Sequence, residues 1–239
     1  YYYPDVECSK FVLEARIKGL HEILYNPFYL NLLIKSYKKN HTLSSSLTEI
    51  INELVIERMK LDSEHFPIFQ IAREYESIKL DIKKLALIMT LMSRKSILDT
   101  EFRTIFKESG LYEKLISATP LRKTSTKNTT NWTFDHNIFL ECFAAETLLN
   151  IEDIKDLKNI VCYPNSEIII PEWNEVIAHY VSLLDTDSEL FSSFIEWLSI
   201  YNQNVIVRIE KEKLTVRQRD TIFIKIFSWY KEKKIWITS

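Results

Sequence analysis

The stretch that decides the fold runs from Asn131 to Asn150, with the sequence NWTFDHNIFLECFAAETLLN. It opens with three β-prone residues from Trp132 to Phe134 and turns at Asp135, a residue type that can cap the N-terminus of a helix. Apolar residues at helical spacing then predict one buried helical face. These residues are Ile138, Phe139, Cys142, Phe143, Ala145 and Leu149. We therefore expect a strand, a turn and a buried helix in succession.

The composition predicts a folded protein without a strong net charge. The chain has 239 residues, of which 46% are apolar and 27% are charged. A chain of this length can hold one large domain or two to three small ones. The formal net charge of −2 provides no bulk attraction for nucleic acid or anionic lipid. No apolar run reaches the roughly 18 residues that a membrane-spanning helix needs, so we expect no membrane contact.

The first residues and the cysteines indicate a cytoplasmic piece of a longer protein. The chain starts at Tyr1, without an initiator Met and without the basic and apolar segments of a signal peptide. Cys8, Cys142 and Cys162 are odd in number and lack metal-ligand spacing, which is typical of reduced intracellular thiols. We therefore expect a cytoplasmic fragment.

Glycine is scarce, because only Gly19 and Gly110 occur in the chain. A loop that cradles phosphate needs several glycines so that backbone N–H groups can approach the anion. Neither G-x-x-x-x-G-K-[ST] nor G-x-G-x-x-G can be written from two distant glycines. The chain therefore carries no nucleotide-binding loop of its own, and the low glycine content indicates a mainly α fold.

Helical and strand-like segments alternate with polar breaks. Asn26-Pro27 interrupts the first helix, because the residue before proline is pushed out of the α region, and Pro27 suits the first turn of the next helix. Asp99 or Thr100 is expected to cap a later helix, and Gly110 to end it. We predict helices over 8–23, 28–34, 46–61, 78–93, 99–107, 111–117, 151–160, 172–184, 187–201 and 215–234, and strands over 121–123 and 132–134 around a polar tip at 125–131.

Three of these helices have well-marked apolar faces. The residues expected to point inward are Leu47, Ile50, Ile51, Leu54, Val55 and Met59 in the third helix, Ile78, Leu80, Ile82, Leu85, Ala86, Ile88 and Met89 in the fourth, and Trp173, Val176, Ile177, Tyr180 and Leu184 in the helix after Pro171. Glu53 to Arg58 are expected on a solvated face.

Two short motifs resemble one protein family. Phe134 and His136, followed by Glu141 and the pair Ala144-Ala145, resemble the end of the winged-helix domain in NACHT-type STAND NTPases, a class of signal-transduction proteins. Asn26-Pro27-Phe28-x-Leu30 resembles the motif that opens the helical domain after the nucleotide-binding core of that family.

The resemblance implies a fold and a domain order. It implies a helical domain at 1–77 and a winged helix at 78–150, whose first helix is similar at Leu85-Ala86-Leu87 and whose short β-hairpin is the wing. An α-helical, solenoid-like extension is expected at 151–239. The nucleotide-binding core, with the loop that binds phosphate, would lie in an upstream domain of the same protein.

The resemblance also implies two cofactor-binding residues. Pro27 would pack near the adenine base, and His136 would contact the β-phosphate of ADP. Imidazole can donate a hydrogen bond to a phosphate oxygen, and a helix N-terminus favours an anion. The alternatives are that Pro27 only starts a helix and that His136 only braces the strand-to-helix turn.

No catalytic constellation accompanies these residues. Glu141 could be a general base by residue type, but no catalytic arrangement accompanies it, and a helix-surface or interdomain salt bridge is the expected role. His179 lies beside an apolar helical face and is expected to be structural. No zinc spacing and no Ser-His-Asp order is present, so we expect no catalytic residue and no metal site in this chain.

The sequence thus predicts the regulatory part of a NACHT-like NTPase that uses ADP or ATP with Mg. This chain alone would neither bind nucleotide tightly nor hydrolyse it, whereas the parent protein would be an ATPase. Oligomerisation on activation, a protein ligand sensed by the C-terminal helices and a role in innate or antiphage defence are implied by the resemblance.

The alternative is a helical adaptor whose winged helix binds protein or DNA. Arg122, Lys123 and Lys127 would form a small basic patch on the wing. The expected recognition helix at 111–117 lacks the Arg, Asn and Gln face that reads base edges, so nucleic acid is not the expected partner. A self-contained enzyme is the third and weakest choice.

Overall fold

The computed structural model describes residues 7–20, 23–43, 47–65, 71–107, 120–126, 129–210 and 213–233. The described chain is mainly helical with a small three-stranded antiparallel sheet, which confirms the predicted fold class. The chain forms two compact units, unit 1 (Tyr1–Phe143) and unit 2 (Ala144–Ser239). The predicted boundaries at 77 and 150 stay predictions.

Helix α1 (Cys8–Ile17) ends earlier than predicted, because Gly19 adopts a left-handed conformation with φ of 70°. The N–H of Gly19 donates to the carbonyl of Arg16, and the N–H of Leu20 donates to the carbonyl of Ala15. This pattern is a Schellman motif, which closes a helix through a glycine and an apolar contact. A short 3-10 turn, η1 (Ile23–Tyr25), follows, so the predicted helix 8–23 was too long.

Helix α2 (Pro27–Asn40) starts as predicted, with Pro27 in its first turn. The side chain of Asn26 caps it by accepting the N–H of Phe28 at 3.0 Å. The helix continues well past Ile34, where the predicted helix ended, and itself ends where His41 turns left-handed with φ of 54°. The polar residues at its end, Lys39 and Asn40, are exposed. Because they are polar, the sequence pattern did not extend the predicted helix through them.

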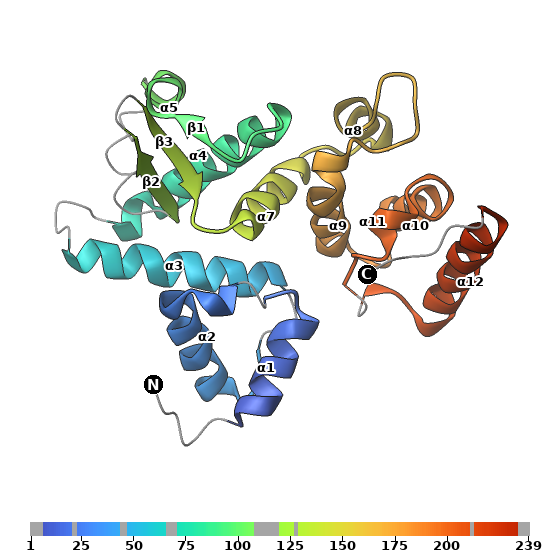
Figure 1. Ribbon diagram of the computed structural model, residues 1–239, viewed down its shortest axis with the longest axis horizontal. Helices are drawn as coiled ribbons and strands as arrows, with labels where there is room; N and C mark the ends of the chain where they lie inside the picture. Colours follow the sequence, from blue (N-terminus) through green and yellow to red (C-terminus); the bar gives the residue numbers. More distant parts are fainter. Residues whose placement is uncertain are drawn as a thin grey trace. The chain divides into compact units, whose positions relative to one another are not determined.

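Helix α3 (Leu47–His65) buries five of its six predicted inward residues, and the side chain of Met59 lies outside the part described. In unit 1, α3 lies between α1 and α2 on one side and the sheet, with α4 and α5, on the other (Figure 1). Helix α4 (Ile71–Leu91) buries Ile78, Ile82, Leu85, Ala86 and Met89. Leu80 was predicted to point inward but is 68% exposed.

Helix α5 (Asp99–Phe106) packs on the sheet through Phe102, whose ring centroid lies 5.9 Å from that of Trp132, and it also buries Phe106. Neither Asp99 nor Thr100 caps this helix, because Leu98 is its N-cap residue. The N–H of Leu98 donates to the Glu101 carboxylate at 3.1 Å. Asp99 instead accepts a hydrogen bond from the indole N–H of Trp132 at 2.7 Å, which ties the helix to the sheet. Gly110 and the predicted helix 111–117 lie outside the described residues.

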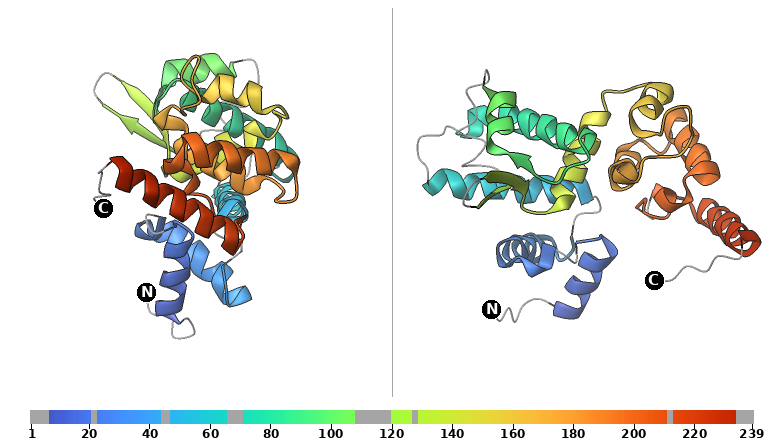
Figure 2. Two further views of the ribbon diagram at one scale, coloured as in Figure 1. Left: turned by 90° about the vertical axis from the view of Figure 1, so that its right-hand side faces the viewer. Right: turned by 45° about the horizontal axis from the view of Figure 1, so that its top comes forward.

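The sheet has the order β1-β3-β2, with all pairs antiparallel. Strands β2 (Leu121–Ser125) and β3 (Thr130–Phe134) form a twisted hairpin that projects from unit 1 (Figure 2). Both strands are longer than predicted, because polar residues outside the core still pair through their backbones. Strand β1 (Ile97–Leu98) was not predicted, since two residues are too few to show alternation.

Helix α7 (Asn137–Leu148) follows β3 after a two-residue turn. It buries apolar residues over most of its surface, as the predicted buried helix requires, and Phe143 packs against Phe134 with ring centroids 6.2 Å apart. Leu149 was predicted to be buried but follows the end of the helix and is 43% exposed.

Unit 2 is a succession of helices, coloured from yellow to red in Figure 1. Its core gathers large aromatic side chains, among them Trp173, Tyr180, Phe191, Phe194 and Trp197. The five residues predicted to point inward after Pro171 are all buried, which confirms that prediction. The elements are α8 (Ile154–Val161), η2 (Pro171–Trp173), α9 (Asn174–Leu183), α10 (Glu189–Tyr201), α11 (Gln203–Ile206) and α12 (Val216–Lys233).

A buried asparagine fastens the loop after α8 to the end of α10. Asn202 is 2% exposed, and its side-chain oxygen accepts the N–H of Ile169 at 2.8 Å. Its amide nitrogen donates to the carbonyl of Glu167 at 2.8 Å. The indole N–H of Trp197 reaches the same carbonyl at 3.2 Å. Polar groups that stabilise this loop are therefore enclosed in the unit and paired.

Candidate functional site

The structure brings together the two motifs that the sequence placed in different domains. Tyr29, two residues after Pro27, donates its hydroxyl to the Asp135 carboxylate at 2.6 Å across 106 residues of sequence. The Tyr29 ring is 1% exposed and packs against Phe139 on α7 with centroids 5.1 Å apart. The start of α2 and the β3–α7 turn are therefore in direct contact in unit 1, a pairing that the sequence pattern did not predict.

His136 occupies the turn between β3 and α7 and is half-buried. Its Nδ1 accepts the N–H of Ile138 at 3.2 Å, and its carbonyl accepts the N–H of Phe139 at 3.2 Å. His136 therefore caps α7, and the expectation that Asp135 would be the cap was wrong. The carboxylate of Asp135 instead accepts the Tyr29 hydroxyl, and the N–H of Asp135 donates to the carbonyl of Pro120 at 2.8 Å.

The cap decides which nitrogen of the His136 ring carries a proton. A nitrogen that accepts a backbone N–H cannot be protonated, so a neutral ring carries its hydrogen on Nε2. The bracing role that was one of two alternatives for this histidine is present in the structure. The other alternative, a contact with a nucleotide phosphate, stays a prediction.

Pro27 lies exposed at the first position of α2, and Tyr25, two residues before it in the sequence, is 86% exposed. The guanidinium of Arg58, on α3, lies over the Phe28 ring at 4.8 Å from its centroid. This cation is half-buried rather than on a solvated face as predicted. The start of α2 thus has the exposed ring of Pro27, the Arg58 guanidinium and the turn that contains His136 around it.

Sequence reasoning missed Tyr29, Asp135 and Arg58 as parts of this region. Tyr29 and Asp135 each directly neighbour a motif residue, but nothing in a single sequence says that they meet. Arg58 sits at a helical position among acidic residues, which made it resemble a surface residue. The useful signal would have been the aromatic pair Phe28-Tyr29, because two large rings at a helix start indicate packing against another element.

Arg122 and Lys123 of the wing lie on opposite faces of the hairpin. Lys123 pairs in register with Trp132, and its amine lies 5.8 Å from the Trp132 ring centroid. Arg122 pairs with Thr133 and faces the other side of the hairpin, because neighbouring strand residues alternate. Lys127 lies outside the described residues. The predicted basic patch is therefore wrong for the pair Arg122 and Lys123.

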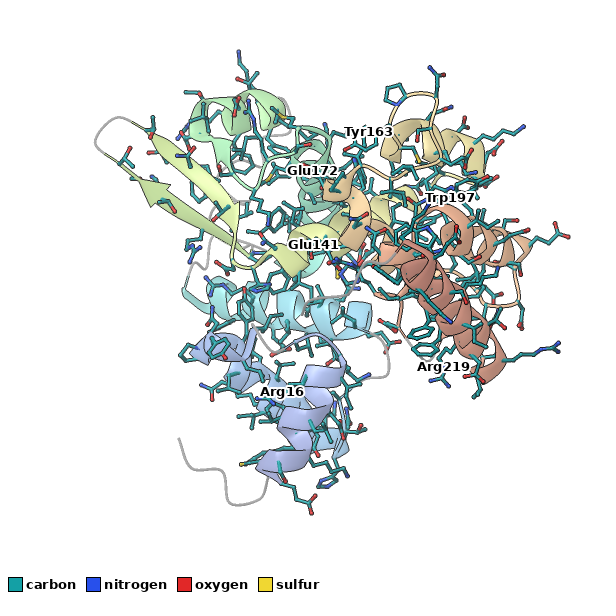
Figure 3. The ribbon with its side chains drawn as sticks, turned by 45° about the vertical axis from the view of Figure 1, so that its right-hand side comes forward. Arg16, Glu141, Tyr163, Glu172, Trp197 and Arg219 are labelled. Carbon is teal, nitrogen blue, oxygen red and sulfur yellow. The ribbon has the colours of Figure 1, made fainter. Side chains whose placement is uncertain are left out.

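A pocket of about 540 Å³ in unit 2 is lined by α8 and the loop that follows it. The Lys158 amine forms a salt bridge with the Glu167 carboxylate at 2.6 Å and lies over the Trp197 ring. Figure 3 labels Tyr163 on this loop and Trp197 on α10. Burial, with a smaller contribution from the Glu167 charge, raises the pKa of the Cys162 thiol to about 11. The thiol is therefore protonated at neutral pH and is a poor nucleophile.

Other candidate groups have structural surroundings. Burial lowers the pKa of His179 to about 4, so this histidine is neutral at physiological pH, in line with its expected structural role. Glu141 lies half-buried on α7 (Figure 3). Within the described ranges, no three His, Cys, Asp or Glu side chains gather as a metal site requires.

Comparison with known proteins assigns no family. No family model matches the sequence, and no curated protein matches it. Among the helices that the structure describes, none combines the length and the apolar character needed to cross a membrane. The assignment of a function therefore depends on the geometry of unit 1.

Proposed function

We propose that the chain is the regulatory part of a NACHT-like signal-transduction NTPase of the cytoplasm. In this function, Pro27 and His136 form a face of unit 1 that meets ADP held by a nucleotide-binding domain elsewhere in the same protein. The observation that carries the proposal is the contact between Tyr29 and Asp135. It joins the two motifs that resemble this family, and a function at one shared nucleotide requires such proximity.

The chemistry of each residue suits one part of ADP. The exposed ring of Pro27 offers an apolar surface to the adenine base. His136 offers an Nε2–H donor to a phosphate oxygen, from a ring whose orientation its own cap holds. The hydrogen bond from the Tyr29 hydroxyl to the Asp135 carboxylate lessens, but does not cancel, the repulsion that this negative charge would exert on phosphate. The phosphate-binding loop, Mg and the hydrolytic water would belong to the nucleotide-binding domain.

The proposed role is that of a switch. With ADP bound, His136 holds unit 1 against the nucleotide-binding domain and keeps the protein at rest. A protein ligand sensed by the C-terminal helices would shift the population toward a released, ATP-bound and oligomeric state, because the ligand binds that state more tightly. Antiphage or innate defence is the biological setting that the family resemblance favours.

The experiment measures ADP in the native protein, captured from source cells with an antibody against this chain. We expect about one ADP per polypeptide, and we expect His136→Ala to speed ADP dissociation by about tenfold or more, because a hydrogen bond to a charged group is lost. His41→Asn is the control, since His41 is an exposed, left-handed helix cap and Asn tolerates that conformation. A native protein without nucleotide, or a His136→Ala variant with unchanged dissociation, would contradict the proposal.

The second candidate is a helical adaptor that binds another protein. The observation that favours it is the exposed apolar face of α12, where Val216, Phe223, Ile224 and Phe227 are each more than half exposed. The helix carries five basic and two acidic residues, so an acidic partner would be favoured. Salt-sensitive binding to a DNA duplex, lost when Arg122 and Lys123 become Ala, would instead identify a DNA-binding adaptor.

A further inference from the structure

Tyr29 differs from the other aromatic residues of α2 in reaching a polar partner on a distant segment. Its ring packs edge-on against Phe28 at 5.1 Å and against Phe139 on α7 at 5.1 Å. The hydroxyl extends past this apolar contact to the Asp135 carboxylate, in a partly buried hydrogen bond of 2.6 Å. Such a short bond to a carboxylate is among the stronger hydrogen bonds in proteins.

Two further hydrogen bonds hold the turn that Tyr29 contacts. The N–H of its first residue, Asp135, donates to the carbonyl of Pro120, and Nδ1 of its second residue, His136, accepts the N–H of Ile138. A change in the backbone at Asp135 therefore moves His136 directly, because the two residues are adjacent. The Tyr29 hydroxyl supplies the hold from α2, which is the element that also carries Pro27.

We propose that Tyr29 is the positioning residue for His136, and this inference rests on the function proposed above. The hydroxyl of Tyr29 holds Asp135 and thereby keeps the His136 ring capped on α7 through Nδ1, with its hydrogen on Nε2. The same contact ties the start of α2 to the turn. Release of ADP from His136 and separation of α2 from the turn are consequently coupled, so each promotes the other.

The first test uses the 239-residue chain and no nucleotide. Tyr29→Phe keeps the ring contacts with Phe28 and Phe139 and removes the hydroxyl. We expect the amides of Ile138 and Phe139 to exchange hydrogen about tenfold faster in this variant, since the loss of a hydrogen bond to a charged group lowers the free energy of local opening. Asp135→Asn keeps an acceptor oxygen without the charge, and a smaller increase is expected.

The second readout reports the His136 ring itself. Nitrogen chemical shifts of the imidazole are expected to show the Nε2–H tautomer in the unaltered chain and a mixture of tautomers in Tyr29→Phe. Tyr37→Phe is the matched control, because Tyr37 lies on the same helix, is 4% exposed and packs its ring on Phe11. A loss of stability alone would not change the tautomer, so this readout separates positioning from general support.

The third test uses the native, nucleotide-bound protein. Tyr29→Phe is expected to speed ADP dissociation by about tenfold, and it should add little when His136→Ala is already present, because both changes act through one contact. Unchanged amide exchange and an unchanged tautomer in Tyr29→Phe would overturn the inference and leave the proposed function intact. Absence of ADP from the native protein would overturn the proposed function, whatever the tautomer shows.

Discussion

Each unit joins distant segments through a polar contact, but the two contacts have different surroundings. In unit 2, Asn202 is almost completely enclosed, and both ends of its amide bind the backbone of one loop. In unit 1, the bond between Tyr29 and Asp135 lies beside exposed Pro27 and half-buried His136. An enclosed polar group specifies one packing, whereas a contact at the edge of a solvent-facing region can open while the unit stays folded.

This difference gives the two units different expected roles. Unit 2 has a core of interlocked aromatic rings and a buried amide, so its polar groups stabilise the fold. Unit 1 places its long-range polar contact between the two motifs that the sequence singled out. Mutations in unit 2 should therefore act on stability, and mutations at the Tyr29 contact should act on the His136 turn.

The largest expected effect is the loss of a central ring in unit 2. Phe194 is fully buried and packs against Tyr180 and Trp197 with centroids 5.3 and 5.7 Å apart. Phe194→Ala should lower the free energy of unfolding by about 3–5 kcal/mol, measured by urea unfolding. Phe223→Ala removes the same group from a position that is 69% exposed, and a change within about 0.5 kcal/mol is expected. Equal losses in both variants would contradict the core assigned to unit 2.

The next effect depends on pH and arises from His179. Its pKa falls from 6.5 in the unfolded chain to about 4 in the folded one, so the unfolded state binds more protons between these values. The stabilising contribution of neutral His179 should be complete above pH 6.5. The free energy of unfolding should then fall as the pH approaches 4, by on the order of 2–3 kcal/mol. His179→Gln should flatten this dependence. A decline of the same size in the variant would show that other groups cause it.

A smaller effect is expected from the enclosed amide. Asn202→Ala leaves the buried N–H of Ile169 without its acceptor, which should cost about 2 kcal/mol in urea unfolding. Asn204→Ala, at an exposed position on α11, is the control and should change stability by less than about 0.5 kcal/mol. If both variants were equally stable, Asn202 would not be the residue that fastens the loop.

Features that depend on periodicity and local chemistry could be predicted from the sequence. Pro27 at a helix start, the inner face of α3 and the buried residues of α9 were predicted, because each follows from spacing or from the fixed φ of proline. The β2–β3 hairpin was also predicted, from two short strand-like segments around a polar tip. Its length was underestimated, because backbone pairing continues through polar residues.

Features that depend on distant partners could not be predicted in this way. Asp135 has the residue type of a cap, yet His136 takes that role because Tyr29 binds the aspartate from 106 residues away. Leu80 fits an apolar stripe by spacing but points outward on α4. The contact that defines the candidate site is of this kind, since a single sequence does not show which segments meet.

The most direct test of the central claim is the identity of the native polypeptide that contains this chain. Capture from source cells with an antibody, followed by mass spectrometry, would give its size and its peptides. Our account predicts a polypeptide much larger than the 28.4 kDa of this chain, with peptides that contain the G-x-x-x-x-G-K-[ST] loop absent here. A native polypeptide of 28.4 kDa without such a loop would contradict the regulatory role and favour the adaptor.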